Sequence, residues 1–229
     1  TILYSLAHIV VGLIGSVIIA LILNEIRGKI LPKLYQTTYI LPNFLSMVVV
    51  SYIVFAFLGQ YGLINKVILE GLGMQPIHFY FEPKYWPFIL VFVQFWHGVG
   101  MGSVIYLAAM AGIDSSLYEA AIIDGANKKQ QIWHITLPQI RSVMIVITLL
   151  SLGGIFRGNF GLHYQVPLDS GFLYDVTNIV DTYVYRALMN MNDIGMSAAA
   201  GLFQSVIGAI MIVAMNQIVR KIDPENSLW

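Results

Sequence analysis

Two long apolar segments of this chain are separated by a polar insert that begins Glu119-Ala120-Ala121-Ile122-Ile123-Asp124-Gly125 and ends Ile135-Thr136-Leu137-Pro138. Long apolar segments predict membrane helices, so the insert is expected to face water on one side of a bilayer. A polar element held at that place is typical of a docking site for another protein. The pattern therefore predicts a membrane protein that works with a partner.

Composition supports a membrane protein. The chain has 229 residues, of which 58% are hydrophobic and 10% charged, and its mean hydropathy is +0.75. These values are too apolar for an ordinary soluble domain. Twelve basic residues balance twelve acidic ones, so no net charge favours nucleic acid as a partner. The absence of cysteine excludes disulfides, thiol nucleophiles and cysteine metal sites, and leaves the compartment undecided.

The apolar runs predict five membrane-spanning helices, because about 20 apolar residues cross the hydrocarbon core as a helix. They are roughly residues 1–23, 35–58, 86–112, 140–156 and 195–219. The runs are continuous rather than alternating, and an open sheet edge cannot be satisfied in lipid, so strands are excluded. We therefore expect an all-α, polytopic transmembrane bundle that forms a single domain over residues 1–229.

The first residue, Thr1, already lies inside an apolar run, without an initiator Met or a basic segment before it. We therefore expect that an upstream spanning helix is missing and that the full protein has at least six spans.

The distribution of Lys and Arg predicts the orientation in the membrane. Eight basic residues flank loops on one side, which is therefore expected to be cytoplasmic: Arg27, Lys29, Lys33, Lys128, Lys129, Arg141, Arg220 and Lys221. Four lie on the other side: Lys66, Lys84, Arg157 and Arg186. The insert and the tail at 221–225 are then cytoplasmic, while the long loops 59–85 and 157–194 face outward.

Within the insert the sequence predicts a helix, a turn and a second helix. Ser115 or Ser116 is expected to cap the first helix, with Glu119 in its first turn. Gly125 allows a turn or a close approach that a Cβ atom would block. The second helix is expected over residues 126–135, before Pro138 opens the next span. Ile132, Trp133 and Ile135 are expected to anchor this surface helix, and the polar residues around the turn suit a groove on another protein. On pattern alone, a loop that merely rests on the membrane interface fits equally well.

The spacing Glu-Ala-Ala, three residues, Gly, nine residues, Ile-x-Leu-Pro resembles the signature loop of permease subunits in binding-protein-dependent ABC importers. Residues 119–138 match it without a gap, within an insert that we place at 113–138. The remaining chain is similar in span order and in the phrases at 181–186 and 222–226. It looks most like the LplB-like sugar permeases, which import oligosaccharides derived from polysaccharides.

The resemblance implies a type I ABC importer permease fold, in the bacterial inner membrane, with a short cytoplasmic coupling helix. The positions that match the coupling loop are Glu119, Ala120, Ala121, Asp124, Gly125, Ala126, Asn127, Leu137 and Pro138. The implied partners are a second homologous permease, two ATPase subunits and an extracytoplasmic binding protein. ATP and Mg would be bound by the ATPase subunits, and this sequence contains no phosphate-binding Gly-Lys-Ser or Gly-Lys-Thr loop of its own. The chain is therefore expected to be a transport subunit without cofactor or enzymatic activity, working by alternating access.

A sugar path needs polar groups at membrane depth, because each hydroxyl that leaves water needs a new partner. The corresponding spans of related permeases suggest a path lined by Asn43, Gln94, Gly98, Met101, Ser151, Ile155 and Asn159. The simpler alternative is that these polar groups bond neighbouring helices, and that Met101 and Ile155 only pack. For Arg157, pairing with an acidic sugar or a loop carboxylate competes with snorkelling to the lipid headgroups.

Other classes fit the sequence less well. An intramembrane hydrolase needs a metal-binding pair or paired aspartates within spans, and the five histidines are scattered. An ion-coupled secondary sugar carrier is the alternative that remains, although its charged groups usually lie at membrane depth, which is not seen here. A channel needs a filter or a charged ring, and a structural scaffold would explain the insert only by chance. The identity of the sugar, its charge, and homodimer against heterodimer stay open.

Overall fold

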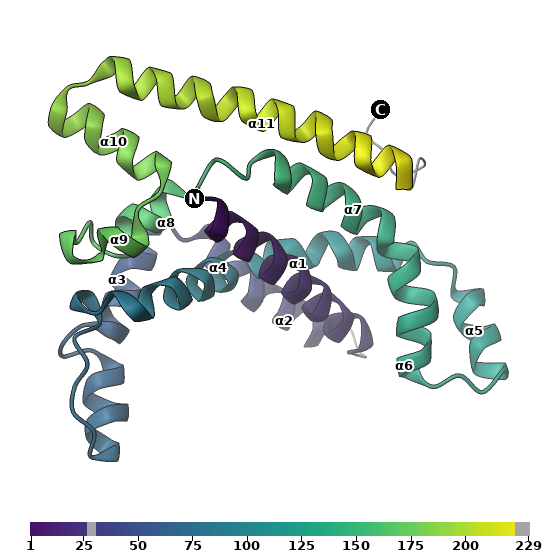
Figure 1. Cartoon of the computed structure of the whole chain (residues 1–229). Helices are drawn as coiled ribbons and strands as arrows, with labels where there is room; N and C mark the ends of the chain where they lie inside the picture. Colours follow the sequence, from purple (N-terminus) through teal and green to yellow (C-terminus); the bar gives the residue numbers. More distant parts are fainter. Residues whose placement is uncertain (27–30, 223–229) are drawn as a thin grey trace.

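The computed structural model describes residues 1–26 and 31–222, and within these residues the chain contains helices and no strand (Figure 1). The all-α prediction is therefore confirmed for the described chain. Between the helices lie short 3-10 and π segments at residues 41–44, 64–72, 79–85, 132–136 and 171–173. The α-helices are α1 (Ile2–Glu25), α2 (Leu31–Ile40), α3 (Met47–Leu58), α4 (Trp86–Ala111), α5 (Ser115–Ile123), α6 (Lys128–Gln131), α7 (Leu137–Gly153), α8 (Phe160–Gln165), α9 (Tyr174–Thr177), α10 (Val180–Met191) and α11 (Ile194–Ile222).

Four helices in the described chain are long and apolar enough to cross a membrane, or five spans if one bent pair counts as a span. The four are Ile2–Glu25, Pro83–Ala111, Lys128–Gly153 and Ile194–Lys221. Only 11% to 28% of each hydrophobic window is buried inside the chain. Most of each span is therefore left to contact lipid or another subunit.

The span predicted at 35–58 is not one straight helix. Its two halves, Lys33–Phe44 and Met47–Leu58, are bent by 102°. The break follows Pro42, which has no N–H to donate. The backbone is extended at Leu45. Ser46 then caps α3, because its hydroxyl accepts a hydrogen bond from the Val49 N–H. A bent pair of this kind is either a broken span or a re-entrant loop.

The boundaries predicted around Pro138 were wrong. Instead of a separate helix over 126–135 and a span over 140–156, one continuous helix runs from Lys128 to Gly153. The five residues Ile132–Thr136 form a π-helical turn just before Pro138. Proline has no N–H to donate, and in a regular α-helix its ring clashes with the carbonyl four residues earlier. The wider π turn before Pro138 accommodates both effects. The second part of the insert, from Lys128, and the following span are consequently one continuous helix.

The core forms where α1 crosses α4 (Figure 1). Small residues permit the close crossing: a Cβ on Gly15 would meet the ring of Phe95, and one on Gly102 would meet the Ser16 hydroxyl. One buried cluster joins α1, α4 and α7, and another joins α3, α4 and α8. The packing therefore places α1, α4 and α7 side by side in the centre of the molecule.

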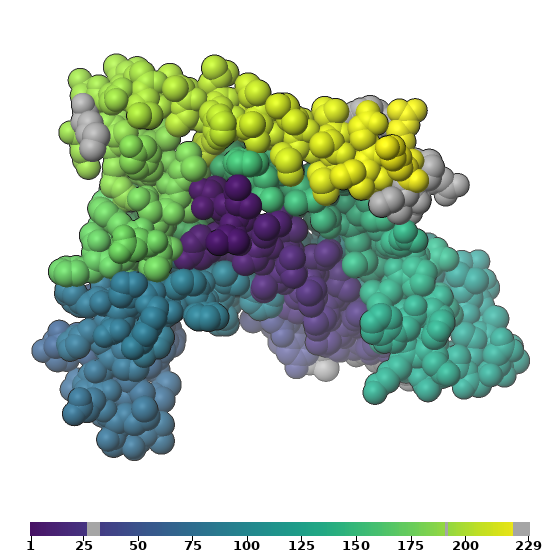
Figure 2. Space-filling view, viewed as in Figure 1, coloured from purple at the N-terminus to yellow at the C-terminus, as the bar shows by residue number. Residues whose placement is uncertain are grey.

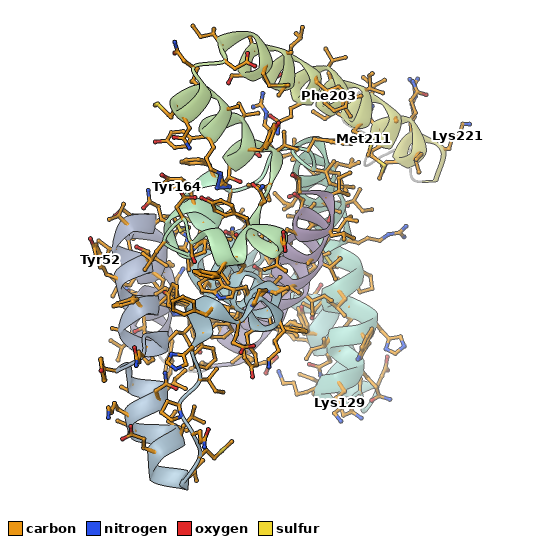
Figure 3. All side chains as sticks on the ribbon, turned by 60° about the vertical axis from the view of Figure 1, so that its left-hand side comes forward. Tyr52, Lys129, Tyr164, Phe203, Met211 and Lys221 are labelled. Carbon is orange, nitrogen blue, oxygen red and sulfur yellow. The ribbon has the colours of Figure 1, made fainter. Side chains whose placement is uncertain are left out.

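The elements that the sequence assigns to opposite sides of the membrane lie at opposite ends of the bundle. Figure 1 shows α5, α6 and the end of α11 at one end, and α8, α9, α10 and the lobe of residues 59–85 at the other. Figure 3 likewise places Lys129 and Lys221 away from Tyr164. The predicted cytoplasmic residues Arg27 and Lys29, and the similar phrase at 222–226 from residue 223 on, lie outside the described residues.

The segment 157–194, predicted as a loop, is largely helical. It contains α8, α9 and α10, and Arg186 of α10 contacts residues in and beside α9. The guanidinium of Arg186 pairs with Asp169 at 2.8 Å, donates to the Asn178 side-chain oxygen at 2.8 Å, and lies 4.1 Å from the ring centroid of Tyr174. This end of the molecule is thus a folded helical cap rather than the loop predicted from the sequence.

Candidate functional site

The first helix of the insert is capped differently from the prediction. Asp114, not Ser115 or Ser116, is the N-cap of α5, and its carboxylate accepts a hydrogen bond from the Ser116 N–H at 2.9 Å. The hydrogen bonds from Ser116 lower the pKa of the Asp114 carboxyl. Glu119 lies beyond the first turn and is exposed, so its predicted interaction with the helix dipole was also wrong.

Gly125 ends α5 in a left-handed turn. Its φ is +80°, and its N–H donates to the Ile122 carbonyl while the Ala126 N–H donates to the Ala121 carbonyl at 2.8 Å. This pair of hydrogen bonds is a Schellman motif, which favours glycine because other residues are strained at positive φ. The predicted turn is confirmed. A close approach is not found, because a Cβ at Gly125 would have no atom within 4 Å.

The second helix begins with a capping box. Asn127 accepts from the Gln130 N–H at 3.0 Å, and the Gln130 side chain accepts from the Asn127 N–H at 2.7 Å. The hydroxyls of Tyr118 and Thr136 lie 2.9 Å apart and join α5 to the π turn. The insert therefore has its own polar scaffold, and side-chain contacts fix the angle between its two helices.

Lys128 ties the insert to the first span. Its ammonium lies 2.9 Å from the Glu25 carboxylate at the end of α1. The pair is exposed, so it contributes little to stability. Its importance is positional, because it brings the end of α1 and the start of the continuous helix to the same place.

The outer surface of the insert is apolar and acidic. Ile123 is 86% exposed and Trp133 is 69% exposed. The predicted anchoring role of Trp133 stays a prediction. Leu117 and Ile122 are also exposed. Glu119 and Asp124 lie exposed on the same short element. Solvent-exposed apolar side chains beside charges are typical of a protein-docking surface.

The structure places the coupling positions of the resemblance on this one insert. Glu119, Ala120, Asp124, Gly125, Asn127 and Pro138 are exposed, and Ala121, Ala126 and Leu137 are half-buried. Gly125 and Asn127 have clear structural roles as turn and cap. Their contact with a partner stays a prediction.

A second candidate site lies in the membrane region, where cavities flank α1. One cavity, of about 250 Å³, lies between α1, α4 and α7, and the other, of about 180 Å³, lies between α1 and α4. His8, Gly12 and Ser16 border both. The polar residues around the cavities are His8, Ser16, Gln94, Tyr106, Thr148 and Ser151. Such a mixture of apolar walls and a few polar groups is typical of a small-molecule site.

Two hydroxyl groups of the larger cavity, those of Thr148 and Ser151, have their donors occupied. Thr148 donates to the Met144 carbonyl at 2.7 Å, and Ser151 donates to the Ile147 carbonyl at 2.8 Å. Each hydroxyl oxygen retains lone pairs and can accept a hydrogen bond. Gly12 and Gly98 add open space, since a Cβ on either would meet no atom within 4 Å. The cavity can therefore receive a ligand with hydroxyl donors.

The structure brings some of the predicted path residues together. Gln94, Gly98 and Ser151 border the cavities. Asn159 caps α8, and its amide donates to the side-chain oxygen of Gln94, which borders the smaller cavity, at 2.9 Å. This contact is also the helix-to-helix bond that the simpler alternative describes.

The other predicted path residues lie elsewhere. Met101 is 43% exposed and does not border either cavity, Ile155 is buried, and Asn43 lies half-buried in the break after Pro42. Ser151, Ile155 and Asn159 are spaced by four residues, but they do not share one helical face, because α7 ends at Gly153. A ligand-binding role of any path residue stays a prediction.

The contribution of α1 to the cavity was missed. His8, Gly12 and Ser16 follow one another at spacings of four in an otherwise apolar run. This spacing predicts one polar, narrow face of a helix and was a signal that the sequence contained. The described residues hold no group of three or more His, Asp or Glu that could bind a metal ion.

Arg157 lies in the irregular segment between α7 and α8. It is exposed and donates to the Ser205 hydroxyl of α11 at 3.0 Å. The nearby Asp181 carboxylate instead accepts from the Gly158 N–H at 2.8 Å. Arg157 therefore connects α7 to α11 in this structure, rather than forming the loop ion pair considered from the sequence.

Comparison with solved structures gives the class of protein. The chain matches a subunit of a structure described as a bacterial alginate ABC transporter in complex with an alginate pentasaccharide-bound periplasmic protein, with a TM-score of 0.89 and 30% identity. The match covers 96% of this chain and 75% of that one. Together with the apolar helices, this defines a multi-pass membrane protein with the type I ABC permease fold.

The family is shown directly by the sequence. Residues 12–224 match the family described as binding-protein-dependent transport system inner membrane component, and the chain belongs to this family. It is 37% identical to Protein LplB of Bacillus subtilis over 93% of this chain. It is 34% identical to the polygalacturonan/rhamnogalacturonan transport system permease protein YteP of the same organism, over 92% of this chain. The chain spans about two thirds of these relatives, namely 66% of LplB and 65% of YteP.

Proposed function

We propose that this chain is the permease subunit of an ATP-driven importer and forms part of the membrane path for an oligosaccharide. One observation carries this proposal: a single helix connects the exposed insert with the membrane cavity. It begins at Lys128, directly after the Gly125 turn, and its far end carries Thr148 and Ser151 at the cavity wall. Movement imposed on the insert must therefore reach the cavity.

The continuous helix supports transmission over a useful distance. Its 26 residues correspond to about 39 Å at a rise of 1.5 Å per residue. The Lys128 ion pair adds a connection from the same place to α1, which forms the opposite wall of the cavity. A partner that displaces the insert would shift both walls, which is what alternating access requires.

The proposed energy source is a pair of cytoplasmic ATPase subunits that bind the insert. The exposed side chains of Ile122 and Ile123 would enter an apolar groove, with Glu119 and Asp124 making polar contacts around it. ATP and Mg would be bound by the ATPase subunits, and this chain would contribute transport without catalysis. Closure of the ATPase pair would then pull the insert.

The proposed membrane partner is a second, homologous permease, most simply in a heterodimer. Between 72% and 89% of each hydrophobic window is not buried within this chain. Figure 2 also shows an open hollow between the lobe of residues 59–85 and the purple N-terminal helices in the middle of the view. A second subunit would cover part of this surface and complete the path. An extracytoplasmic binding protein would dock on the opposite end, over the folded cap of α8 to α10.

The proposed substrate class is an oligosaccharide. Its hydroxyl groups suit the acceptor oxygens of Thr148 and Ser151 and the amide of Gln94. The names of YteP and of the alginate transporter refer to acidic sugar polymers, whereas another relative, 27% identical, is named for arabinooligosaccharides. These relatives support a sugar and do not choose between acidic and neutral oligomers.

The test is reconstitution of the full-length protein with its partner subunits in liposomes. We expect ATP hydrolysis and uptake to rise when a binding protein loaded with galacturonate or arabinose oligomers is added. Uptake should stop when the ATPase subunits are omitted. Sugar uptake driven by an ion gradient without ATP would refute the importer and establish the secondary carrier.

A further inference from the structure

Two buried histidine nitrogens lack a hydrogen-bond partner, and their rings lie close together. They are the Nε2 atoms of His8 in α1 and His163 in α8. In the part of the chain that the structure describes, no other buried side-chain nitrogen or oxygen lacks a partner. The two ring centroids are 6.2 Å apart. Because an unpaired buried polar atom is costly, two such atoms on neighbouring rings indicate one hydrogen-bonding group bound between them.

The surroundings of His163 fix which of its nitrogens can accept. The residue is 3% exposed, and its Nδ1 lies 2.9 Å from the Thr177 carbonyl oxygen. A carbonyl can only accept, so Nδ1 carries the hydrogen and Nε2 of the neutral ring presents a lone pair. Burial lowers the pKa of His163 to about 4, which keeps the ring neutral at pH 7.

Neighbouring groups hold the His163 ring in place. The ring packs edge-on against Tyr4, with centroids 4.6 Å apart. The Tyr4 hydroxyl is itself used, because it donates to the Val176 carbonyl at 2.6 Å. Neither Tyr4 nor Thr177 is therefore available to satisfy Nε2 of His163.

His8 connects this pair to the membrane cavities, since it borders both of them. If Nε2 of His8 carries a hydrogen, this nitrogen needs a hydrogen-bond acceptor, whereas Nε2 of His163 needs a hydrogen-bond donor. One oxygen that makes two hydrogen bonds of about 2.9 Å at a tetrahedral angle joins nitrogens roughly 4.7 Å apart. That span fits between rings whose centroids are 6.2 Å apart.

We propose that His8 and His163 form a binding site for one O–H group, which donates to Nε2 of His163 and accepts from Nε2 of His8. The O–H group belongs either to a water molecule or to a sugar hydroxyl that enters from the cavity. The sugar source rests on the proposed function, whereas the water source does not. A metal ion fits less well, because the described residues offer no third His, Asp or Glu ligand.

A double-mutant cycle tests the site. The variants are His8→Phe, His163→Phe and the double variant, in the full-length protein assembled with its partner subunits. Phenylalanine keeps a ring for packing and removes both nitrogens. The two measurements are Tm in lipid nanodiscs without sugar, and KM for ATP-driven uptake of galacturonate trisaccharide in liposomes.

The two sources give different results. If the group is a bound water, each single variant lowers Tm. The decrease in the double variant is smaller than the sum of the two single decreases by at least about 3 °C, because the second change removes a nitrogen that has already lost its partner. For a sugar hydroxyl, each single variant raises KM about fivefold, the double variant raises it no further, and the Tm changes add.

The control pairs His8→Phe with His97→Phe. His97 is a half-buried histidine whose Nε2 lies 3.1 Å from the Leu45 carbonyl oxygen, so this nitrogen already has a hydrogen-bond partner. The changes in Tm and KM caused by His97→Phe should therefore add to those caused by His8→Phe. Additive effects of His8 and His163 in both measurements would overturn the site. If the wild type shows no ATP-driven uptake, the proposed function fails, and additive Tm effects alone then overturn the site.

Discussion

The turn at Gly125 is the most direct place to separate fold from coupling. Replacement by valine puts a β-branched residue at a φ of +80°. No atom lies within 4 Å of the new Cβ, so the cost is conformational strain rather than a clash. Such strain amounts to roughly 1–2 kcal/mol. The insert can relieve it by leaving the Schellman geometry, which changes the direction in which the docking surface is presented.

A strain of that size reduces the population of the correct turn about 5- to 30-fold relative to other loop geometries. We therefore expect Gly125→Val to reduce ATP-coupled uptake by about that factor. Gly125→Asn is the matched control, because asparagine tolerates the left-handed region, and it should retain uptake within about threefold. The assay is uptake and ATP hydrolysis by the reconstituted transporter, with Tm as the measure of folding.

The expected pattern is a large loss of uptake in the valine variant with little change in Tm, because the insert projects from the core. Equal uptake by the valine and asparagine variants, both close to wild type, would refute the reasoning. Equal and severe loss in both would show that the partner contacts position 125 itself, and that the turn geometry is not the cause.

Three further predictions follow from the same structure. Glu119→Lys reverses an exposed charge and should abolish ATP-coupled uptake. Chemical denaturation should show that the free energy of unfolding changes by no more than about 0.5 kcal/mol. Uptake at the wild-type rate would exclude Glu119 from docking. The exposed ion pair of Lys128 and Glu25 should contribute at most about 1 kcal/mol to stability, and a double-mutant cycle in low and high salt should show a coupling that shrinks with salt. His163 has a folded pKa of about 4, below its unfolded value, so the unfolded chain binds the extra proton first and stability falls as pH drops from about 6.5 to 4. The Tm of His163→Phe should fall less steeply over this interval, and parallel Tm curves would show that His163 does not carry the effect.

The main elements of the fold could be predicted because each depends on local composition. The five apolar runs correspond to the four spanning helices and the bent pair, and the turn at Gly125 was visible as a glycine between two helical segments. Helix ends were less predictable. The end of α7 at Gly153 was signalled by two adjacent glycines, yet the run of apolar residues continues past them.

The bend at Pro42 and the continuity through Pro138 show why local signals were insufficient. Both prolines interrupt regular hydrogen bonding. Just after Pro42, between Phe44 and Met47, the chain turns by 102°, whereas before Pro138 a π turn is inserted and the helix continues. Which of these occurs depends on what packs around the proline, and no residue spacing reports that.

By itself, the sequence determined an all-helical membrane domain with a polar insert on one side, because apolar length and the spacing of Gly, Pro and charged residues act locally along the chain. Only the tertiary structure decided that α1 forms the wall of the cavity and that His8 lies beside His163. The physical reason is that cavities and shared hydrogen-bond partners arise where helices distant in sequence cross. Their positions depend on side-chain packing at the crossing rather than on the propensity of either helix.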